Sequence, residues 1–359
     1  MTGLVQGDEI RVGLIGFGYS TRTFHRPLLM ATAGYRIAAV ASSRPREVEA
    51  ELPGVAIFAD PVALTRHPEL DLVVIATPNA THASLAEAGV RAGRHVVVDK
   101  PFTLTADEAR HLTALARDRG TLLSVFQNRR WDSDFLTVQD ALRRGLLGQV
   151  ALCESRFDRF RPQIRDRWRE GAGPGAGLLY DLGPHLIDQA LVLFGPPESV
   201  QATLARQRPE AVSVDFAHLV LRNGERIVTL QAGSLVPGGS PRFSLHGDRA
   251  SLIKRHPDVQ EAQLRQGKRP GSAGWGVDPD DAVLYDGASG EPRTVKSIPG
   301  EQRRYYEAVR EALHGRAANP VTPEQATTVM RVLEAALRSG AEHRRVVLEY
   351  ADDERAAWP

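Results

Sequence analysis

IRVGLIGFGYST, residues 10–21, decides the fold of this chain. Its first six residues are mostly apolar or β-branched and predict a strand, Ile10–Ile15. A Gly-Phe-Gly turn follows at once and leads into a helix expected to begin near Thr23. A Gly-x-Gly turn between a strand and a helix is typical of dinucleotide binding, although Thr21 occupies the place of the usual third glycine. A glycine turn with a purely conformational role is the alternative interpretation.

The segment after this motif alternates apolar runs with helical stretches. The further predicted strands are Tyr35–Ala41, Val55–Phe58, Leu72–Ala76, His95–Asp99 and Leu122–Phe126. Helices are expected at Thr81–Ala92 and Thr105–Arg119, the second opened by a capping box and stopped by Gly120. Such alternation, with near-continuous apolar strands, indicates a parallel sheet covered on both faces. We therefore expect a doubly wound α/β domain over residues 1–126.

The remaining sequence has longer strand-like segments. The predicted strands are Val150–Phe160, Val200–Ala205, Asp215–Arg222 and Arg226–Ala232, with a hairpin turn at Asn223-Gly224. The predicted helices are Asp181–Phe194 and Pro323–Ser339, the latter opened by Thr322-Pro323, and a long loop is expected over Gln266–Pro292. These features indicate a second, α+β domain over residues 127–359, built on a large, mainly antiparallel open sheet.

The composition limits the possible partners and compartments. The 359 residues include 45 Lys and Arg against 44 Asp and Glu, so no basic excess favours nucleic acid or membranes. The single cysteine, Cys153, cannot form an internal disulfide, and we expect no structural metal. The N-terminus lacks a secretory signal, and no apolar run approaches the roughly 20 residues that cross a bilayer. We expect a cytoplasmic, soluble protein with a small-molecule substrate.

The end of the second predicted strand bears on the choice of nucleotide. It reads Ala41-Ser42-Ser43-Arg44, without the carboxylate that accepts hydrogen bonds from the ribose 2′-hydroxyl of NAD. Two hydroxyls and a guanidinium are suited to a 2′-phosphate, which favours NADP(H) while leaving NAD(H) possible. Alternatively, Arg44 is a solvated loop residue and Glu47 contacts the ribose.

Two further segments follow predicted strands of the first domain. Ala76-Thr77-Pro78-Asn79 and Asp99-Lys100-Pro101 both lie at carboxyl ends, where doubly wound sheets bind ligands. Lys100 could donate to a reacting oxygen there. A lysine in a surface turn is, however, usually just solvated.

In the second domain, Asp181, His185 and Asp188 share one face of a predicted helix, at spacings of four and seven residues. A histidine between carboxylates can act as a tunable proton acceptor. Taken alone, a surface histidine with ordinary ion pairs is the simpler interpretation. Pro184 implies either that the helix begins close to Asp181 or that it kinks there.

These segments together resemble the Gfo/Idh/MocA family of oxidoreductases over most of the chain, from Arg11 to about Tyr350. The resemblance is carried by GLIGFGYS (13–20), ATPNATHA (76–83), GRHVVVDKP (93–101) and YDLGPHLID (180–188). Three more segments are similar to NADP-dependent scyllo-inositol 2-dehydrogenases: SVFQNRRWDSDFLTV (124–138), RFRPQIRDRWRE (159–170) and GSLVPGGSPRFSLHG (233–247). Two positions depart from the family pattern, Asp99 in place of the usual Glu and Pro184 in the helix.

The resemblance implies a Rossmann domain and hydride transfer between nicotinamide and a secondary alcohol or ketone of a cyclitol or sugar. It implies that Lys100 is the catalytic lysine, that Asp181 and His185 are its acid and histidine pair, and that His82 and Asn79 lie near the nicotinamide. The full set of expected cofactor-binding residues is Gly16, Phe17, Gly18, Tyr19, Ser20, Ser42, Ser43, Arg44, Thr77, Pro78, Asn79, His82 and Asp99. The candidate substrate-binding residues are Asn128, Arg129, Asp158, Arg159, Arg161 and Arg165.

Two alternatives and one expectation about assembly remain. An aldose or deoxy-sugar dehydrogenase would use the same residues on a different ring. A non-catalytic, nucleotide-sensing regulator could also use the same fold. Family resemblance suggests a homodimer or homotetramer.

Overall fold

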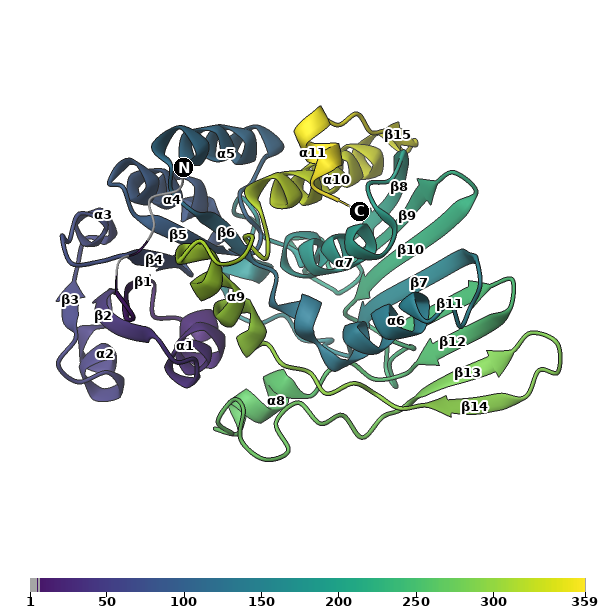
Figure 1. Cartoon of the computed structure of the whole chain (residues 1–359). Coiled ribbons are helices and arrows are strands. Elements are labelled where there is room, and N and C mark those ends of the chain that lie inside the picture. Colours follow the sequence, from purple (N-terminus) through teal and green to yellow (C-terminus); the bar gives the residue numbers. More distant parts are fainter. Residues whose placement is uncertain (1–4, 6, 359) are drawn as a thin grey trace. The chain divides into compact units, whose positions relative to one another are not determined.

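The computed structural model describes residue 5 and residues 7–358, which form two compact units (Figure 1). The first unit contains the chain up to Asn128 together with Gln260–Trp275 and Glu301–Thr327. The second contains Arg129–Val259, Gly276–Gly300 and the chain from Thr328.

The first unit is built on a parallel sheet of six strands in the order β3-β2-β1-β4-β5-β6 (Figure 1). The strands are β1 (Ile10–Ile15), β2 (Tyr35–Ala41), β3 (Ala56–Phe58), β4 (Leu72–Ile75), β5 (His95–Asp99) and β6 (Leu123–Phe126). Every residue of β4 and β5 is buried, as expected for strands covered on both faces. The doubly wound sheet is thus confirmed, and its strand order reverses between β1 and β4.

The strands of this sheet are connected by η1 (Thr21–His25), α1 (Arg26–Ala31), α2 (Pro45–Glu51), α3 (Pro61–Thr65), η2 (Asn79–Thr81), α4 (His82–Arg91) and α5 (Ala106–Arg119). Two helices from later in the chain, α8 (Gln260–Arg265) and α9 (Arg303–Leu313), belong to the same unit. The helix expected from Thr23 begins instead with the π-helical turn η1. The capping box of α5 is confirmed, because Glu108 N donates to Thr105 Oγ1 at 3.2 Å. Gly120 ends this helix in the left-handed conformation, at φ +62°.

The second unit contains a nine-stranded sheet in the order β14-β13-β12-β11-β7-β10-β9-β8-β15 (Figure 1). The strands are β7 (Val150–Asp158), β8 (Ser199–Ala205), β9 (Phe216–Asn223), β10 (Arg226–Gly233), β11 (Phe243–Gly247), β12 (Ala250–Lys254), β13 (Ala282–Asp286), β14 (Pro292–Val295) and β15 (Val346–Val347). Only the β7–β10 pairing is parallel. The predicted open, mainly antiparallel sheet is confirmed.

Helix α7 (Leu178–Phe194) packs on the central strands β7, β9 and β10. It is preceded by its N-cap residue Gly177, where φ is +92° and a Cβ atom would lie 3.1 Å from the Val214 carbonyl oxygen. A side chain at Gly177 would therefore be both strained and crowded. The helix starts three residues before Asp181, and Pro184 lies in its second turn, where the missing N–H costs one helix bond.

The other helical segments of the second unit border the sheet. They are η3 (Asn128–Trp131), α6 (Ser133–Arg143), η4 (Trp168–Glu170), α10 (Pro323–Glu342) and α11 (Asp352–Ala356), of which η3 and α10 begin within the first unit. In α10, Ser339 Oγ accepts from Ala202 N of β8 at 2.9 Å. None of the helices in the described residues is long and apolar enough to cross a membrane.

One element was missed in the expected loop over Gln266–Pro292. That segment contains β13, which pairs antiparallel with β12 and β14. Ala282 and Leu284 alternate with more exposed residues along this strand, but the surrounding Gly, Pro and Asp residues obscure the pattern. The loop prediction was therefore wrong over these five residues. The Asn223-Gly224 hairpin between β9 and β10 is confirmed, with Gly224 at φ +59°.

Candidate functional site

The loop after β1 has the conformation that the glycine motif requires. Gly16 has φ +91°, and a Cβ atom there would lie 2.6 Å from the Ala76 carbonyl oxygen. Thr21 Oγ1 donates to the Gly16 carbonyl at 2.7 Å, which gives the residue at the third motif position a local role in closing the turn. A Cβ atom at Gly18 would meet one atom within 4 Å, Nη2 of Arg44 at 3.8 Å. The Gly18 backbone thus leaves room for a ligand beside a guanidinium.

The end of β2 carries hydroxyls and a cation, as the sequence predicts. Arg44 N donates to Ser42 Oγ at 3.0 Å, and Ser43 is exposed. The Arg44 guanidinium lies 3.4 Å from Glu47 Oε2, which also pairs with Arg22 at 3.2 Å. Glu47 is therefore already engaged by two arginines. Together, the tight turn, the open Gly18 backbone and Arg44 fit a dinucleotide pyrophosphate and an adjoining anionic group.

The other residues of the glycine loop have different environments. Phe17 is buried in the core of the first unit. Tyr19 is 53% exposed, and its hydroxyl donates to Glu261 of α8 at 2.9 Å. The partial burial of this side chain, together with the Glu261 carboxylate, raises the pKa of Tyr19 to about 12. Ser20 Oγ donates to Asp99 Oδ2 at 2.5 Å and thereby links the loop to the end of β5.

Asp99 is a buried, ionised carboxylate at the end of β5. Its Oδ1 accepts from Lys100 N at 2.8 Å, and its Oδ2 lies 3.8 Å from His25 Nε2. Burial alone would raise the pKa of Asp99, but His25, Lys100 and Ser20 outweigh it and hold this pKa well below the usual range. The backbone N–H of Lys100 therefore donates to an ionised carboxylate, at the same edge of the sheet as the glycine loop.

His25 and Tyr306 support this carboxylate, and sequence reasoning missed both. Tyr306 Oη lies 2.7 Å from His25 Nδ1, and the Phe126 ring centroid lies 4.2 Å from that of the imidazole. Both His25 and Tyr306 are fully buried. The tyrosine is 281 residues away from the histidine in the chain, so no local pattern could have paired them.

His82 and Asn79 are buried side chains in the segment that follows β4. The His82 ring is fully buried, with Nδ1 2.7 Å from the Pro101 carbonyl oxygen and Nε2 3.0 Å from that of Thr77. Burial lowers the pKa of His82. The imidazole thus joins the segment after β4, including Pro78, to the segment after β5. Asn79 is buried in the short helix η2.

The three polar residues of α7 have different environments. Asp188 is buried and pairs with the Arg130 guanidinium at 2.6 and 2.8 Å, and burial raises its pKa in spite of this partner. His185 is also buried. Asp181 is partly exposed, with Oδ1 3.4 Å from Arg169 Nε. The expected polar face is therefore largely interior, because α7 is buried around most of its circumference.

A small, partly open pocket lies beside Asp181 in the second unit. Its walls come from the segment after β7, the start of α7 and the loop before β9. The charged side chains that line it are Arg159, Arg161, Arg167, Arg169, Glu170, Asp181, Arg208 and Asp215. Two candidate substrate-binding residues, Arg159 and Arg161, thus adjoin the candidate acid Asp181.

The other candidate substrate-binding residues lie outside the lining of this pocket. Asp158 Oδ2 accepts from Gln231 and Ser240 at 2.9 and 2.6 Å, and Arg165 is exposed outside the pocket lining. Asn128 is buried in η3.

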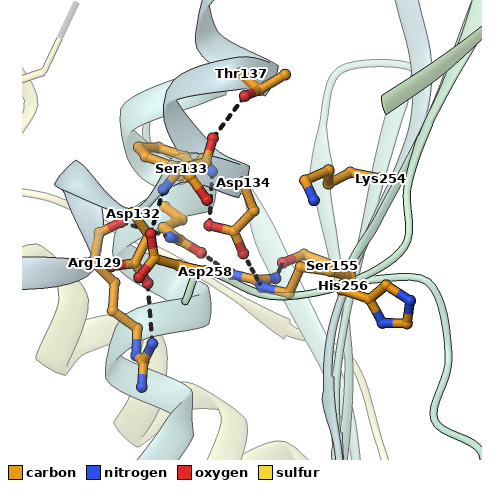
Figure 2. Close-up of polar contacts among 12 residues, drawn as sticks. Arg129, Asp132, Ser133, Asp134, Thr137, Ser155, Lys254, His256 and Asp258 are labelled. Atoms are coloured by element: carbon orange, nitrogen blue, oxygen red, sulfur yellow. Dashed lines mark hydrogen bonds and ion pairs between the residues drawn. The ribbon is translucent and has the colours of Figure 1, made fainter. Parts of the chain in front are cut away.

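Arg129 pairs with Asp132 at 3.0 Å in a buried polar cluster at the start of α6 (Figure 2). In the same cluster Asp134 pairs with Arg242 at 2.9 Å, and Arg242 donates to Ser155 at 2.6 Å. This cluster attaches α6 to β7. Among the described residues, no group of His, Cys, Asp and Glu has the arrangement of a metal site.

Family models match both parts of the chain. The oxidoreductase family model for the NAD-binding Rossmann fold matches residues 10–127, and the C-terminal alpha/beta domain model matches residues 139–348. The fold and the glycine loop thus define an NAD(P)-binding oxidoreductase. The chain belongs to the Gfo/Idh/MocA family.

Similar proteins cover nearly the whole chain. The oxidoreductase YdgJ of Escherichia coli is 49% identical over 94% of this chain and 98% of its own length. The scyllo-inositol 2-dehydrogenase (NADP(+)) IolW of Bacillus subtilis is 39% identical over 96% of this chain and 97% of its own. A crystal structure of an oxidoreductase from Klebsiella pneumoniae has a TM-score of 0.92 at 49% identity, with 98% of each chain covered.

Proposed function

We propose that this protein transfers a hydride between NADP(H) and a secondary alcohol or ketone of a cyclitol or sugar, with a scyllo-inositol or inosose-like ring as the first candidate. The observation that carries the proposal is the position of Lys100. It follows the buried carboxylate of Asp99, at the sheet edge that also holds the glycine loop. The similarity to a scyllo-inositol 2-dehydrogenase supports the choice of ring.

The bound nicotinamide supplies the hydride acceptor or donor. In this proposal, Lys100 donates a hydrogen bond to the reacting oxygen and so stabilises negative charge that develops there. His185 accepts the hydroxyl proton in the oxidation direction and returns it in the reduction direction. Asp181, one helical turn before His185, favours the imidazolium form. Residues 1–126 bind the nucleotide and residues 127–359 bind the ring.

The preference for NADP(H) is part of the proposal. It is supported by the hydroxyls and the guanidinium at residues 42–44 and by the ion pairs of Glu47 with Arg22 and Arg44. A carboxylate neutralised in this way neither repels a 2′-phosphate nor offers free acceptors to a ribose hydroxyl. NAD(H) would then bind more weakly. A homodimer or homotetramer is proposed from family resemblance alone, and light scattering would test the assembly. A cytoplasmic location is proposed from the single cysteine.

A substrate panel tests the proposed function. Cyclitols, aldoses and deoxy sugars, with the corresponding ketones, are assayed by absorbance at the reduced nicotinamide band, separately with NADP(H) and NAD(H). We expect the highest kcat/KM for a cyclitol with NADP(H). The highest kcat/KM for an aldose or deoxy sugar would indicate a dehydrogenase for those rings. Tight nucleotide binding without turnover of any compound would indicate a sensor and contradict the enzyme.

A further inference from the structure

The pocket beside Asp181 is dominated by positive charge. Five arginines and three carboxylates line it. Each carboxylate already has an arginine partner. Asp215 pairs with Arg208 at 2.9 Å, Glu170 pairs with Arg167 and Arg208 at 2.7 and 3.0 Å, and Asp181 lies 3.4 Å from Arg169. Every carboxylate that lines the pocket is therefore already paired with an arginine of the protein.

Arg161 has no such partner. Among the residues that the structure describes, no carboxylate lies within ion-pair distance of its guanidinium. Burial, together with the nearby Arg159, Arg165 and Arg167, lowers the pKa of Arg161 to about 10, and the charge of Asp181 offsets this only in part. Burial and the surrounding arginines thus destabilise the charged form of Arg161. An anion bound beside its guanidinium would relieve that destabilisation.

A neutral polyol does not require this arrangement. Ring hydroxyls both donate and accept hydrogen bonds, whereas guanidinium groups only donate. Arginine forks match carboxylate and phosphate oxygens, and such charge-assisted bonds are shorter and stronger than neutral ones. The serines in the lining, Ser213 and Ser234, add hydroxyl groups to the same walls. The chemistry of the pocket is that of an oxyanion site.

We propose that this pocket binds an anionic group, a carboxylate or a phosphate, carried by the ring substrate. This inference rests on the proposed function and specifies its substrate class: an acidic or phosphorylated sugar or cyclitol. The pocket wall includes Asp181, one turn before His185 on α7, so an anion held there would position the rest of the ring beside the proposed proton acceptor. Arg161 would contribute to specificity and Asp181 to catalysis.

Calorimetric titration of the full-length chain tests this inference. The ligands are D-glucuronate, D-glucose 6-phosphate, neutral D-glucose and inorganic phosphate. The variants are Arg161→Gln and, as a matched control, Arg143→Gln, which removes the same charge from an exposed position on α6, outside the pocket lining. A lost charge-assisted hydrogen bond is worth about 1.5–3 kcal/mol, or roughly 10- to 100-fold in Kd.

We expect one of the two charged sugars to bind at least about tenfold more tightly than D-glucose, and the tighter one identifies carboxylate or phosphate. Arg161→Gln should remove that advantage, and Arg143→Gln should change it by less than about threefold. Equal affinity for charged and neutral sugars, equal effects of the two substitutions, or inorganic phosphate binding as tightly as the phosphorylated sugar would each overturn the inference.

Turnover assays on the same preparations separate this inference from the proposed function. If neutral cyclitol ketones are reduced and the charged sugars show no binding advantage, the anion site is wrong and the proposed function stands. If the charged sugars bind as expected but no ketone or alcohol is turned over, the proposed function is wrong and the anion site stands.

Discussion

In the proposed function, Arg44 determines the preference for NADP(H). Its guanidinium lies beside the open backbone of Gly18, and its contact with Glu47 is exposed and long, at 3.4 Å. An exposed ion pair of this kind contributes less than about 1 kcal/mol, so it can be exchanged for a phosphate contact at little cost. Arg44 is therefore available to a 2′-phosphate although it has a protein partner.

Replacing Arg44 by alanine should raise KM for NADP at least about tenfold, because a charge-assisted hydrogen bond to the phosphate is lost. KM for NAD, which lacks that phosphate, should change by less than about twofold. Steady-state kinetics with both nucleotides measures the difference. Arg46→Ala, an exposed arginine in the same turn, is the control. An equal rise in KM for both nucleotides would show that Arg44 does not bind the 2′-phosphate.

Ionisation of the buried Asp99 carboxylate is expected to stabilise the folded chain. Its pKa is lower in the folded chain than the value of about 4 in an unfolded one, so ionisation favours folding. That stabilisation is present above the unfolded pKa and is lost as the pH falls through the folded pKa. Asp99→Asn should therefore lower the free energy of unfolding by about 1–3 kcal/mol at pH 7, and by progressively less as the pH is lowered below about 4.

Urea unfolding of the nucleotide-free protein at several pH values measures this difference. Asp107→Asn, at an exposed position in the first turn of α5, should cost less than about 1 kcal/mol. If the difference between wild type and Asp99→Asn did not depend on pH, Asp99 would not be an ionised group of lowered pKa.

At the scale of helices and strands, short-range patterns predicted most of the first unit. The apolar runs located all six strands of its sheet, and the Thr105–Glu108 box located the start of α5. Strand β13 was missed because its alternation spans only five residues between turn-forming residues. The burial of His185 and Asp188 could not be predicted, because a helical pattern shows which residues share a face but not which neighbours cover it.

The buried ion pair of Arg130 with Asp188 fixes α7 in the second unit. Arg130→Met should lower the free energy of unfolding by about 3–5 kcal/mol, because it leaves Asp188 as a buried carboxylate without its guanidinium. Chemical denaturation measures the loss. Arg143→Ala, which removes a surface pair with Asp140, should cost less than about 1 kcal/mol.

A double variant, Arg130→Met with Asp188→Asn, should recover part of the stability, because no buried charge is then left without a partner. A double variant as unstable as the sum of the two single variants would contradict this account of the pair.

At the scale of the whole molecule, the sequence offers candidate site residues wherever the chemistry follows a local motif. The glycine loop, Arg44, Lys100 and Asp181 were proposed in this way. His25, Tyr306 and Arg208 were not, because their partners lie far away in the chain or are determined only by packing: Tyr306 contacts His25 across 281 residues, and Arg208 reaches Glu170 across 38. Supporting residues of this kind are defined by the fold rather than by spacing.

The central claim is that Lys100 and His185 carry out the chemistry of an NADP-dependent dehydrogenase. The most direct measurement is kcat/KM for reduction of an inosose by NADPH in Lys100→Ala and His185→Ala, with NADPH affinity followed by nicotinamide fluorescence. Lys296→Ala and His111→Ala, at exposed positions, are the matched controls. Each catalytic variant should lose at least about a hundredfold in kcat/KM while binding NADPH within about threefold of wild type. Turnover near the wild-type rate in either variant would contradict the account.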